Sequence, residues 1–207
     1  MSEPTNSLPT VAAFDVDGTI TTRDCVVPFM RRVTGARRIA PRLGVRPDRL
    51  VPVLARRDRD RLKALAAAAA FRGQRYEDLC VAGASFAEMV HERWLRSDTL
   101  ETLRRHREYG DRTVLVSASF EVYLRPLAGL LGVDEVLATR LAVRDGIATG
   151  ALDGANCRGP EKVARLHGWL GDRSTVRVVA YGDSAGDREM LADADEAHWV
   201  TRDGRAA

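Results

Sequence analysis

The sequence predicts an α/β fold, a Rossmann-like doubly wound parallel sheet with a helical segment inserted after its first strand. From residue 109 on, short apolar runs alternate with helical patterns, an order typical of a parallel sheet with helices on both faces. Residues 21–108 show helical periodicity without strand alternation. We therefore expect residues 1–20 and 109–207 to form the core domain and residues 21–108 a helical cap domain. A chain of 207 residues is long enough for this arrangement.

The elements follow in order from local patterns. A buried strand is expected over residues 11–14, an apolar run with an acidic residue directly behind it. The inserted segment is expected to form helices over residues 25–33, 60–71 and 76–95, and a further helix that Ser97 or Asp98 caps and that runs to residue 109.

The second half is expected to return to strands and helices in alternation. The expected strands cover residues 113–116, 135–142, 147–149, 176–181 and 197–200, with an Asp-Gly hairpin turn at residues 145–146. The expected helices cover residues 120–131, 160–169 and 184–192. Polar side chains that follow such strands gather at the carboxyl edge of the sheet, where sites of this fold class lie.

Charge is unevenly distributed along the chain. Residues 21–108 hold 20 Lys or Arg and 11 Asp or Glu, whereas the remaining residues have an acidic excess, and the net charge is +3. The basic segment could steer an anionic substrate or contact an anionic membrane surface, so peripheral membrane contact stays open. The chain is rich in alanine and arginine, and a biased base composition of its coding sequence is an alternative explanation of the same charge asymmetry.

Composition also bears on the compartment. The three cysteines are odd in number and form no CxxC pair, which favours a reducing environment. The longest apolar run, residues 64–71, is far below the roughly 18 residues that a membrane span needs. The polar first ten residues lack a secretory pattern. We expect a cytoplasmic protein without a transmembrane segment.

Two carboxylates, Asp15 and Asp17, follow the first strand, and Gly18 then allows a sharp turn. Acidic groups held this close repel each other unless a cation lies between them, and oxygen ligands favour Mg²⁺. A metal-bound carboxylate with a second one beside it to move protons can attack an electrophile. We therefore predict that Asp15 attacks phosphorus. An ordinary Asp-Gly turn is the alternative for this segment alone.

Other predicted strand ends carry matching groups. Ser117 follows the second core strand, and its hydroxyl and neighbouring amide can hold phosphate oxygens. Asp183 follows the strand at residues 176–181, with Asp187 one helical turn later. Lys162, in a first helical turn, can reach the same edge and neutralise a phosphoryl group. Each has a simpler explanation, such as a strand terminus or a helix cap. Their joint position at one edge favours a phosphoryl-transfer site.

The chain resembles a haloacid dehalogenase-superfamily hydrolase of subfamily IB, similar to phosphoserine phosphatase. Four segments carry the resemblance in order: Phe14-Asp15-Val16-Asp17-Gly18-Thr19, Val114-Leu115-Val116-Ser117, Lys162, and Gly182-Asp183-Ser184-Ala185-Gly186-Asp187. The inserted segment has the position and helical character of that branch's cap domain. The resemblance therefore covers essentially the whole chain.

The resemblance implies a role for each residue. Asp15 would be the nucleophile that forms an aspartyl-phosphate, and Asp17 would protonate the leaving oxygen and then activate water. Ser117 and Lys162 would hold the phosphoryl group. Mg²⁺ would be held by the Asp15 carboxylate, the Asp17 main-chain carbonyl and the Asp183 carboxylate, with Asp187 in support. The cap would close over the site and exclude water.

The substrate is less well defined. Phosphoserine phosphatases usually have Ser-Gly-Gly-Phe where this chain has Ser117-Ala118-Ser119-Phe120, and residues 156–162 resemble a different subgroup. A phospholipid-precursor, histidinol-phosphate or sugar-phosphate ester is an alternative substrate, and Arg23, Arg31 or Arg56 could meet a second anionic group. The expected partner is a small phosphorylated metabolite, bound by a monomer or homodimer.

Two other classes of protein are alternatives. A phospho-accepting regulatory module also places an Asp, a Ser or Thr and a Lys at strand ends, but nothing obliges it to carry an acid such as Asp17. A nucleic-acid binder could use the arginine-rich insert, but the sequence has no recognised nucleic-acid-binding pattern. We expect no nucleic-acid partner.

Overall fold

The computed structural model describes residues 8–34 and 59–201. In this part of the chain one six-stranded sheet has the strand order β4-β3-β2-β1-β5-β6. The strands are β1 (Thr10–Phe14), β2 (Arg112–Phe120), β3 (Glu135–Arg144), β4 (Ile147–Asp153), β5 (Arg177–Gly182) and β6 (Glu196–Trp199). Neighbouring strands pair in parallel except for β3 and β4, which form an antiparallel hairpin. The predicted α/β fold with a mostly parallel sheet is confirmed.

Strand β1 lies in the middle of the sheet and is buried on both faces. Its side chains alternate between the faces, as a strand requires. Ala12 and Phe14 belong to one apolar cluster, and Val11 and Ala13 belong to the other. Because helices cover both faces, every one of these positions must be apolar. This explains the continuous apolar run that precedes Asp15.

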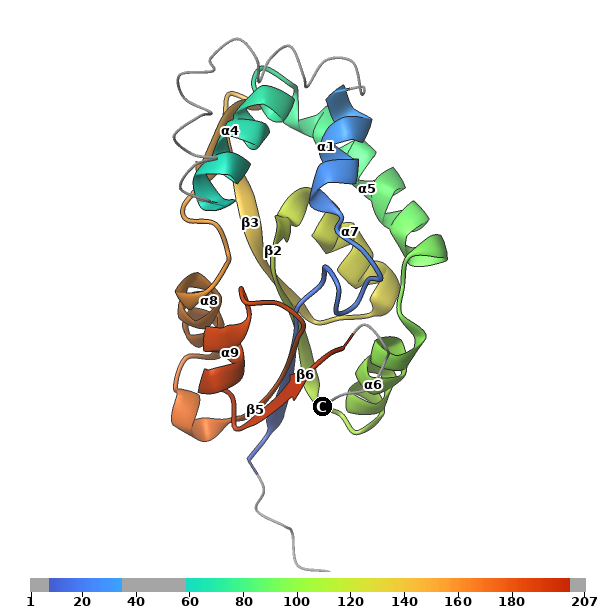
Figure 1. The fold of residues 1–207 in the computed structure, drawn as a ribbon, viewed down its shortest axis with the longest axis vertical. Coiled ribbons are helices and arrows are strands. Elements are labelled where there is room, and N and C mark those ends of the chain that lie inside the picture. Colours follow the sequence, from blue (N-terminus) through green and yellow to red (C-terminus); the bar gives the residue numbers. More distant parts are fainter. Residues whose placement is uncertain (1–7, 35–58, 202–207) are drawn as a thin grey trace, which may run out of the picture.

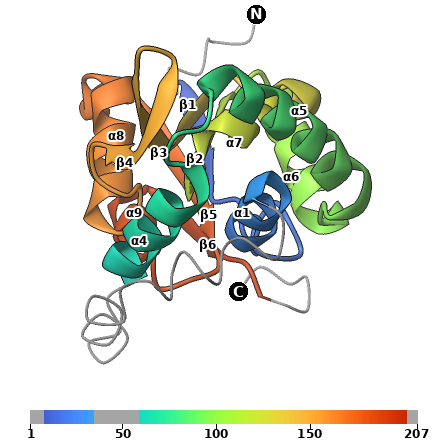
Figure 2. The ribbon, with the colours of Figure 1, turned by 90° about the horizontal axis from the view of Figure 1, so that it is seen from above.

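Helices cover the two faces of the sheet (Figures 1 and 2). On one face lie α8 (Pro160–Leu170) and α9 (Arg188–Asp193). On the other face lie α6 (Ser97–Glu108) and α7 (Glu121–Leu131). A short 3-10 helix at Arg173–Thr175 leads into β5.

Three further helices lie above the carboxyl ends of the parallel strands (Figure 1). They are α1 (Val26–Thr34), α4 (Arg59–Phe71) and α5 (Tyr76–Arg93), called the inserted helices below. Helix α4 packs against β4, and α5 packs along α7. The inserted helices therefore roof the edge of the sheet at which Asp15 lies.

The inserted helices share one apolar cluster with α7 and the sheet. Phe29 of α1 and Phe86 of α5 both contact the ring of Tyr123 in α7, with ring centroids 4.7 and 5.2 Å apart. At Gly83 of α5 a side chain would not fit, since its Cβ would lie 2.3 Å from the carbonyl oxygen of Val122. Helix α5 is thus in close backbone contact with α7. The predicted division into a core domain of residues 1–20 and 109–207 and a helical cap domain of residues 21–108 stays a prediction.

Helix α6 was expected within the inserted segment, but its contacts are with the sheet. The side chain of His106 lies between the carboxylate of Asp111, at 2.7 Å, and the hydroxyl of Tyr181 in β5, at 2.9 Å. Its N-cap is Arg96, without a side-chain cap, so the expectation that Ser97 or Asp98 caps this helix is wrong.

Two further local expectations differ from the structure. Strand β2 continues past Ser117 to Phe120, and its register with β3 shifts between these two residues. The helix expected from residue 184 begins only at Arg188. The reason is a turn in which the hydroxyl and the amide of Ser184 both donate to the carboxylate of Asp187, at 2.8 and 2.9 Å. The other predicted strands and helices are found within a few residues of their expected bounds in the described ranges.

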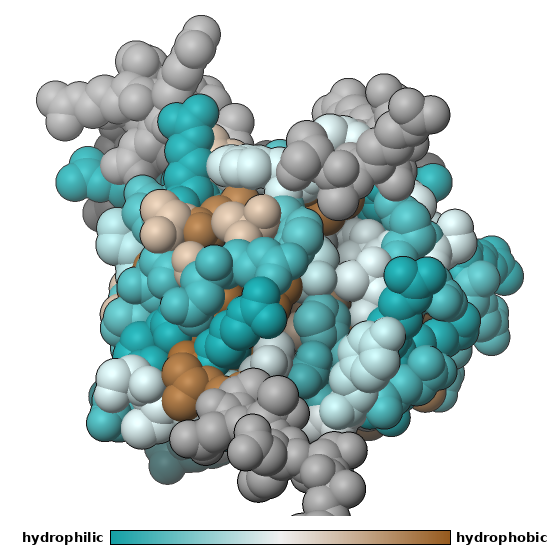
Figure 3. All heavy atoms as spheres, turned by 90° about the horizontal axis from the view of Figure 1, so that it is seen from below, coloured by the Kyte–Doolittle hydropathy of each residue, from teal (hydrophilic) through white to brown (hydrophobic). Residues whose placement is uncertain are grey.

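The end of the molecule opposite the inserted helices is mainly hydrophilic, with only small apolar areas between charged side chains (Figure 3). Among the described residues, no helix combines the length and apolar character that crossing a bilayer requires.

Candidate active site

Asp15 lies directly after β1 at the carboxyl edge of the sheet. Its amide donates to the carbonyl of Tyr181 in the neighbouring strand at 2.9 Å, so strand pairing itself fixes its position. The carboxylate is buried, with 6% of the residue exposed. Its oxygen Oδ1 lies 2.5 Å from Nζ of Lys162, which is 1% exposed in the first turn of α8. A buried ion pair thus joins two segments that are far apart in the sequence.

The ammonium of Lys162 has three acceptors, as many as its N–H donors. They are Asp15 Oδ1 at 2.5 Å, Asp187 Oδ1 at 2.6 Å and the Val116 carbonyl at 2.6 Å. Burial disfavours the charged amine, but the charges of Asp15 and Asp187 outweigh it and raise the pKa of Lys162. Burial also raises the pKa of Asp15 to about 7, although Lys162 acts in the opposite direction.

The loop after Asp17 packs directly against Asp183. Gly18 has a φ of +94°, a conformation that other residues rarely adopt. A Cβ at this position would lie 2.2 Å from Oδ2 of Asp183. The hydroxyl of Thr19 reaches the other oxygen of Asp183 at 3.4 Å. Gly18 is therefore required both by the turn and by the close approach of this carboxylate.

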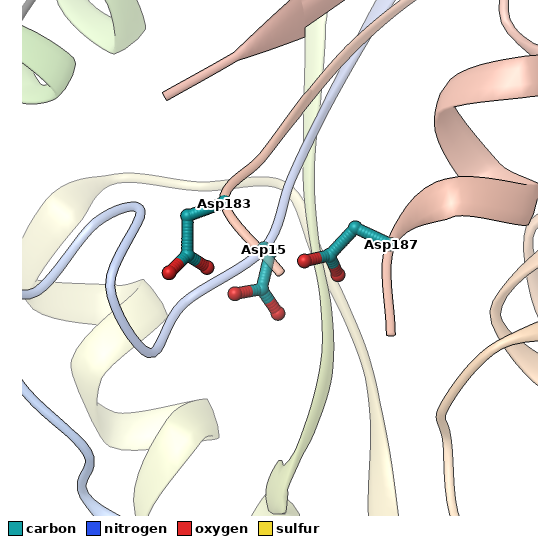
Figure 4. Close-up of side chains that lie close together, drawn as sticks. All are labelled: Asp15, Asp183 and Asp187. Atoms are coloured by element: carbon teal, nitrogen blue, oxygen red, sulfur yellow. The ribbon is translucent and has the colours of Figure 1, made fainter. Parts of the chain in front are cut away.

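Three carboxylates face one another at this edge (Figure 4). Oxygen atoms of Asp15, Asp183 and Asp187 all lie within 4.8 Å of one another, and Asp183 is the exposed member. With Lys162 as the adjoining cation, the ionised cluster has an excess of negative charge. Hard oxygen donors in this state fit a hard divalent cation such as Mg²⁺. The side chain of Asp17 is outside the cluster, and the expectation that its main-chain carbonyl is a ligand stays a prediction.

Asp17 has both carboxylate oxygens engaged. The amide of Cys25 donates to Oδ1 at 2.8 Å, and the hydroxyl of Ser119 donates to Oδ2. Burial raises the pKa of Asp17 to about 6, and the hydrogen bond from Ser119 opposes this rise. A carboxyl group with a pKa near neutrality can both release and accept a proton, as an acid/base group must.

Ser117 is buried on β2, two residues before the Ser119 that donates to Asp17. Its hydroxyl oxygen accepts a hydrogen bond from the amide of Ser119 at 3.1 Å. Because one lone pair of the oxygen is used in this way, the hydroxyl proton remains available to another acceptor. The structure therefore brings Ser117 to the same strand edge as Asp15, Lys162 and Asp17.

A cleft of about 1520 Å³ opens beside the acidic cluster. Asp17, Gly18 and Asp183 line it together with Arg96 and Trp199. Asp183 is thus the member of the cluster that faces the cleft, while Asp15 and Lys162 are buried and do not line it.

The sequence reasoning missed two residues that contact this site. Ser119 was noted only as a departure from glycine, and its hydrogen bond to Asp17 lies at the irregular end of β2, which the sequence does not reveal. Lys63 of α4 reaches the carbonyl of Ala118 from a distant part of the chain. A compositional signal could have identified it, because the chain has only two lysines, Lys63 and Lys162, among 32 basic residues.

The arginines that the sequence suggested for a second anionic group do not converge. Arg23 lies over the ring of Trp94, 5.0 Å from its centroid. Arg31 is exposed on α1, and Arg56 lies outside the described residues. Within the described ranges, these side chains give no basis for choosing a substrate.

Known proteins are similar to this chain in sequence and in fold. The model of the haloacid dehalogenase-like hydrolases matches residues 12–192. The protein CicA of Caulobacter vibrioides is 39% identical over 91% of this chain and 84% of its own length. A phosphoserine phosphatase of Methanocaldococcus jannaschii is 32% identical over 45% of this chain and 46% of its own length. A solved structure of a Bordetella pertussis protein of unknown function has a TM-score of 0.71 at 24% identity, covering 90% of this chain and 87% of its own.

The family match spans all four segments of the site, from Asp15 to Asp187. The relationship to phosphoserine phosphatases agrees with an enzyme of the phosphatase type. The chain therefore belongs to the haloacid dehalogenase-like hydrolases.

Proposed function

We propose that this protein is a Mg²⁺-dependent phosphatase that hydrolyses a small phosphomonoester through an aspartyl-phosphate on Asp15. The observation that carries the proposal is the buried contact between Asp15 and Lys162 inside a cluster of further acids. A carboxylate in this setting can attack phosphorus while Lys162 offsets negative charge on the phosphoryl oxygens. Membership in the hydrolase family supports the same chemistry.

The proposed reaction has two halves. In the first, an oxygen of Asp15 bonds to phosphorus, the bond from phosphorus to the leaving oxygen breaks, and protonated Asp17 gives its proton to that oxygen. In the second, ionised Asp17 takes a proton from water, and the water oxygen bonds to phosphorus. The bond between phosphorus and Asp15 then breaks. Inorganic phosphate leaves, and both carboxyl groups return to their initial states.

The remaining residues bind and orient. Ser117 and Lys162 would hold the phosphoryl oxygens, with a phosphoryl oxygen replacing one of the three acceptors that Lys162 has in the structure. The Asp15 and Asp183 carboxylates and the Asp17 main-chain carbonyl would hold Mg²⁺, with Asp187 in support. When bound, Mg²⁺ shields the attacking carboxylate from the negative phosphoryl group.

We also propose that residues 21–108 act as a cap. The position of the inserted helices above the carboxyl edge supports this, because a roof there excludes water from the reacting groups. The proposed substrate is a small phosphorylated metabolite, with phosphoserine, histidinol phosphate, sugar phosphates and phospholipid precursors as the classes to compare. A cytoplasmic location and a monomeric or homodimeric state remain predictions.

The test is phosphate release from a panel of these phosphomonoesters, with Mg²⁺ or with EDTA, by the parent protein and by Asp15→Asn. We expect Mg²⁺-dependent turnover by the parent, and at least a thousandfold slower turnover by the variant, in line with the loss of a nucleophile. Acid-quenched parent enzyme should carry a hydroxylamine-sensitive phosphoryl group. An Asp15→Asn variant as active as the parent would overturn the proposal.

A further inference from the structure

Lys63, one of the two lysines of the chain, lies half-buried on α4, with its ammonium directed toward β2 and β3. Thirty of the 32 basic residues of the chain are arginines. We infer that this chain uses arginine wherever a positive charge alone is sufficient. A compact ammonium and a planar guanidinium are not interchangeable where the acceptors converge on one point. Lys162 is such a position, with three converging acceptors. The surroundings of Lys63 indicate that it is another.

Among the residues that the structure describes, Lys63 also has three acceptors, all of them neutral. Its ammonium donates to the carbonyl of Ala118, to Oγ1 of Thr139 at 3.1 Å and to Oδ1 of Asn156 at 2.6 Å. It lies over the ring of Phe120, 4.7 Å from the centroid. The three N–H donors of a lysine are thereby all used.

No carboxylate in the described ranges lies within ion-pairing distance of Lys63, unlike Lys162. Burial lowers the pKa of Lys63 to about 8, which reflects the cost of keeping this charge away from water. Charged side chains are rarely buried against neutral groups alone. The three hydrogen bonds have to offset that cost, so the exact placement of the acceptors matters.

The Ala118 carbonyl, which also accepts a hydrogen bond from the hydroxyl of Thr139 at 2.9 Å, is the acceptor that connects Lys63 to the catalytic edge. This carbonyl and the amide of Ser119 belong to one planar peptide unit and point in opposite directions. Fixing the carbonyl toward α4 therefore turns the amide toward Ser117, whose hydroxyl oxygen accepts its hydrogen bond at 3.1 Å. The Ser117 proton is then left to donate elsewhere.

We propose that Lys63 is a positioning residue for phosphoryl binding. By holding the 118–119 peptide unit, it orients the hydroxyl proton of Ser117 toward the phosphoryl group that Asp15 attacks. This inference rests on the proposed function, and it adds a component that comes from the inserted helices. Phosphoryl binding at Ser117 then depends on the contact that α4 makes with the end of β2.

A purely structural role for Lys63 has a matched control in the same helix. Asp60, nearly one turn earlier on α4, accepts a hydrogen bond from Nδ2 of Asn156 at 2.6 Å. It ties α4 to the same loop without touching the Ala118 carbonyl. Asp60→Ala therefore loosens the helix while leaving the 118–119 peptide unit held by Lys63.

The first experiment compares Lys63→Met, Lys63→Arg and Asp60→Ala in the Mg²⁺-loaded protein, with inorganic phosphate as a competitive inhibitor. We expect Lys63→Met to raise the inhibition constant of phosphate and the KM by about tenfold, as the loss of one oriented hydrogen bond predicts. Lys63→Arg should not restore binding, because a planar fork cannot meet three converging acceptors. Asp60→Ala should stay within about twofold of the parent, a change of less than 1 kcal/mol.

Three results would overturn the inference. The first is an unchanged phosphate inhibition constant in folded Lys63→Met, with folding checked by circular dichroism. The second is an equal loss in Asp60→Ala, which would mean that only the docking of α4 matters. The third is restoration of phosphate binding by Lys63→Arg, which would show that the charge, rather than the geometry of the ammonium, determines the effect.

A second experiment does not depend on turnover. Reductive methylation with ¹³C-formaldehyde gives few NMR signals in a chain with two lysines, and Lys63→Met assigns that of Lys63. In the ligand-free protein we expect Lys63 to react about tenfold more slowly than in Asn156→Ala, which lacks one acceptor. Inorganic phosphate should slow the reaction further, because binding and peptide orientation are reciprocally coupled.

These outcomes separate the two proposals. If Asp15→Asn keeps full activity but Lys63 is protected from methylation in the ligand-free protein, the proposed function fails while the contact itself holds. If Lys63 reacts as fast in the parent as in Asn156→Ala, the positioning role fails, whatever the activity of the enzyme.

Discussion

The acidic site has two halves that differ in burial and in how their charges are balanced. In the inner half, Asp15 and Asp187 are buried on either side of Lys162, at 2.5 and 2.6 Å. In the outer half, Asp183 is exposed, and its one side-chain hydrogen bond among the described residues is a 3.4 Å contact with Thr19. Both halves lie at the same edge of the sheet, yet one is closed and the other faces the cleft beside Asp17.

This difference assigns separate tasks to the two halves. The buried carboxylates of the inner half depend on their pairing with Lys162, so this half is fixed in position when the protein folds. The outer carboxylate keeps its oxygens free for a ligand that exchanges with solvent, such as a hydrated metal ion. We expect changes to the inner half to affect folding as well as activity, and changes to the outer half to affect activity alone.

The largest effect is expected for Lys162→Met. Without the ammonium, Asp15 and Asp187 would be buried next to each other without a counter-charge, a change that costs about 3–5 kcal/mol of folding free energy. Phosphatase activity should fall at least a thousandfold. Urea unfolding and phosphate release measure the two effects. In Lys162→Met/Asp187→Asn part of the stability should return, and full stability in the single variant would contradict the pairing.

A smaller effect is expected for Asp183→Asn, and it should be confined to function. Because the side chain is exposed, the free energy of unfolding should change by less than about 0.5 kcal/mol. Affinity for Mg²⁺, measured by calorimetry, and activity should both fall by roughly a hundredfold. Unchanged Mg²⁺ affinity would remove Asp183 from the metal site, and a large loss of stability would remove the contrast between the two halves.

Gly18→Ala probes the backbone between the halves. The left-handed conformation costs an alanine about 1 kcal/mol, and its Cβ would displace the Asp183 carboxylate. Gly110 provides the control, since its φ is +80° but no atom lies within 4 Å of an added Cβ. Both variants should lose similar stability in urea, whereas only Gly18→Ala should lose Mg²⁺ affinity, by about tenfold. Equal Mg²⁺ affinity in the two would show that the contact with Asp183 is unimportant.

The smallest effect is expected for Ser119→Ala, which frees one oxygen of Asp17. A misplaced acid matters most when the leaving group is a poor one, so alkyl phosphates should lose about tenfold in kcat/KM. Aryl phosphates such as p-nitrophenyl phosphate, whose leaving group needs little protonation, should lose about twofold or less. Equal losses for both substrate types would argue against an effect through Asp17.

The sequence was sufficient for the parts of this picture that depend on local pattern. The alternation of apolar runs predicts the parallel sheet, and polar residues behind those runs predict where Asp15, Ser117 and Asp183 lie. The contact of Lys162 with Asp15 follows from the same edge-of-sheet reasoning. These predictions succeed because strand ends in a parallel sheet converge regardless of side-chain detail.

The remaining features depend on tertiary contacts that no local pattern encodes. The Ser184–Asp187 turn replaces a predicted first helical turn because a side chain competes with the helix for backbone donors. Ser119 donates to Asp17 from the part of β2 in which the register with β3 shifts, and the sequence pattern does not predict this shift. Lys63 meets Ala118 across 55 positions of sequence, which requires the docking of α4 to be known.

The close contact between α5 and α7 restricts how substrates can enter. Gly83 lies against the backbone of Val122, and the rings of Phe86 and Tyr123 interlock beside it. Swinging α5 outward would expose these rings to water at every catalytic cycle, a penalty that grows with the apolar area uncovered. We therefore expect substrate and product to pass through the cleft between Asp17 and Trp199, while the inserted helices keep their position against α7.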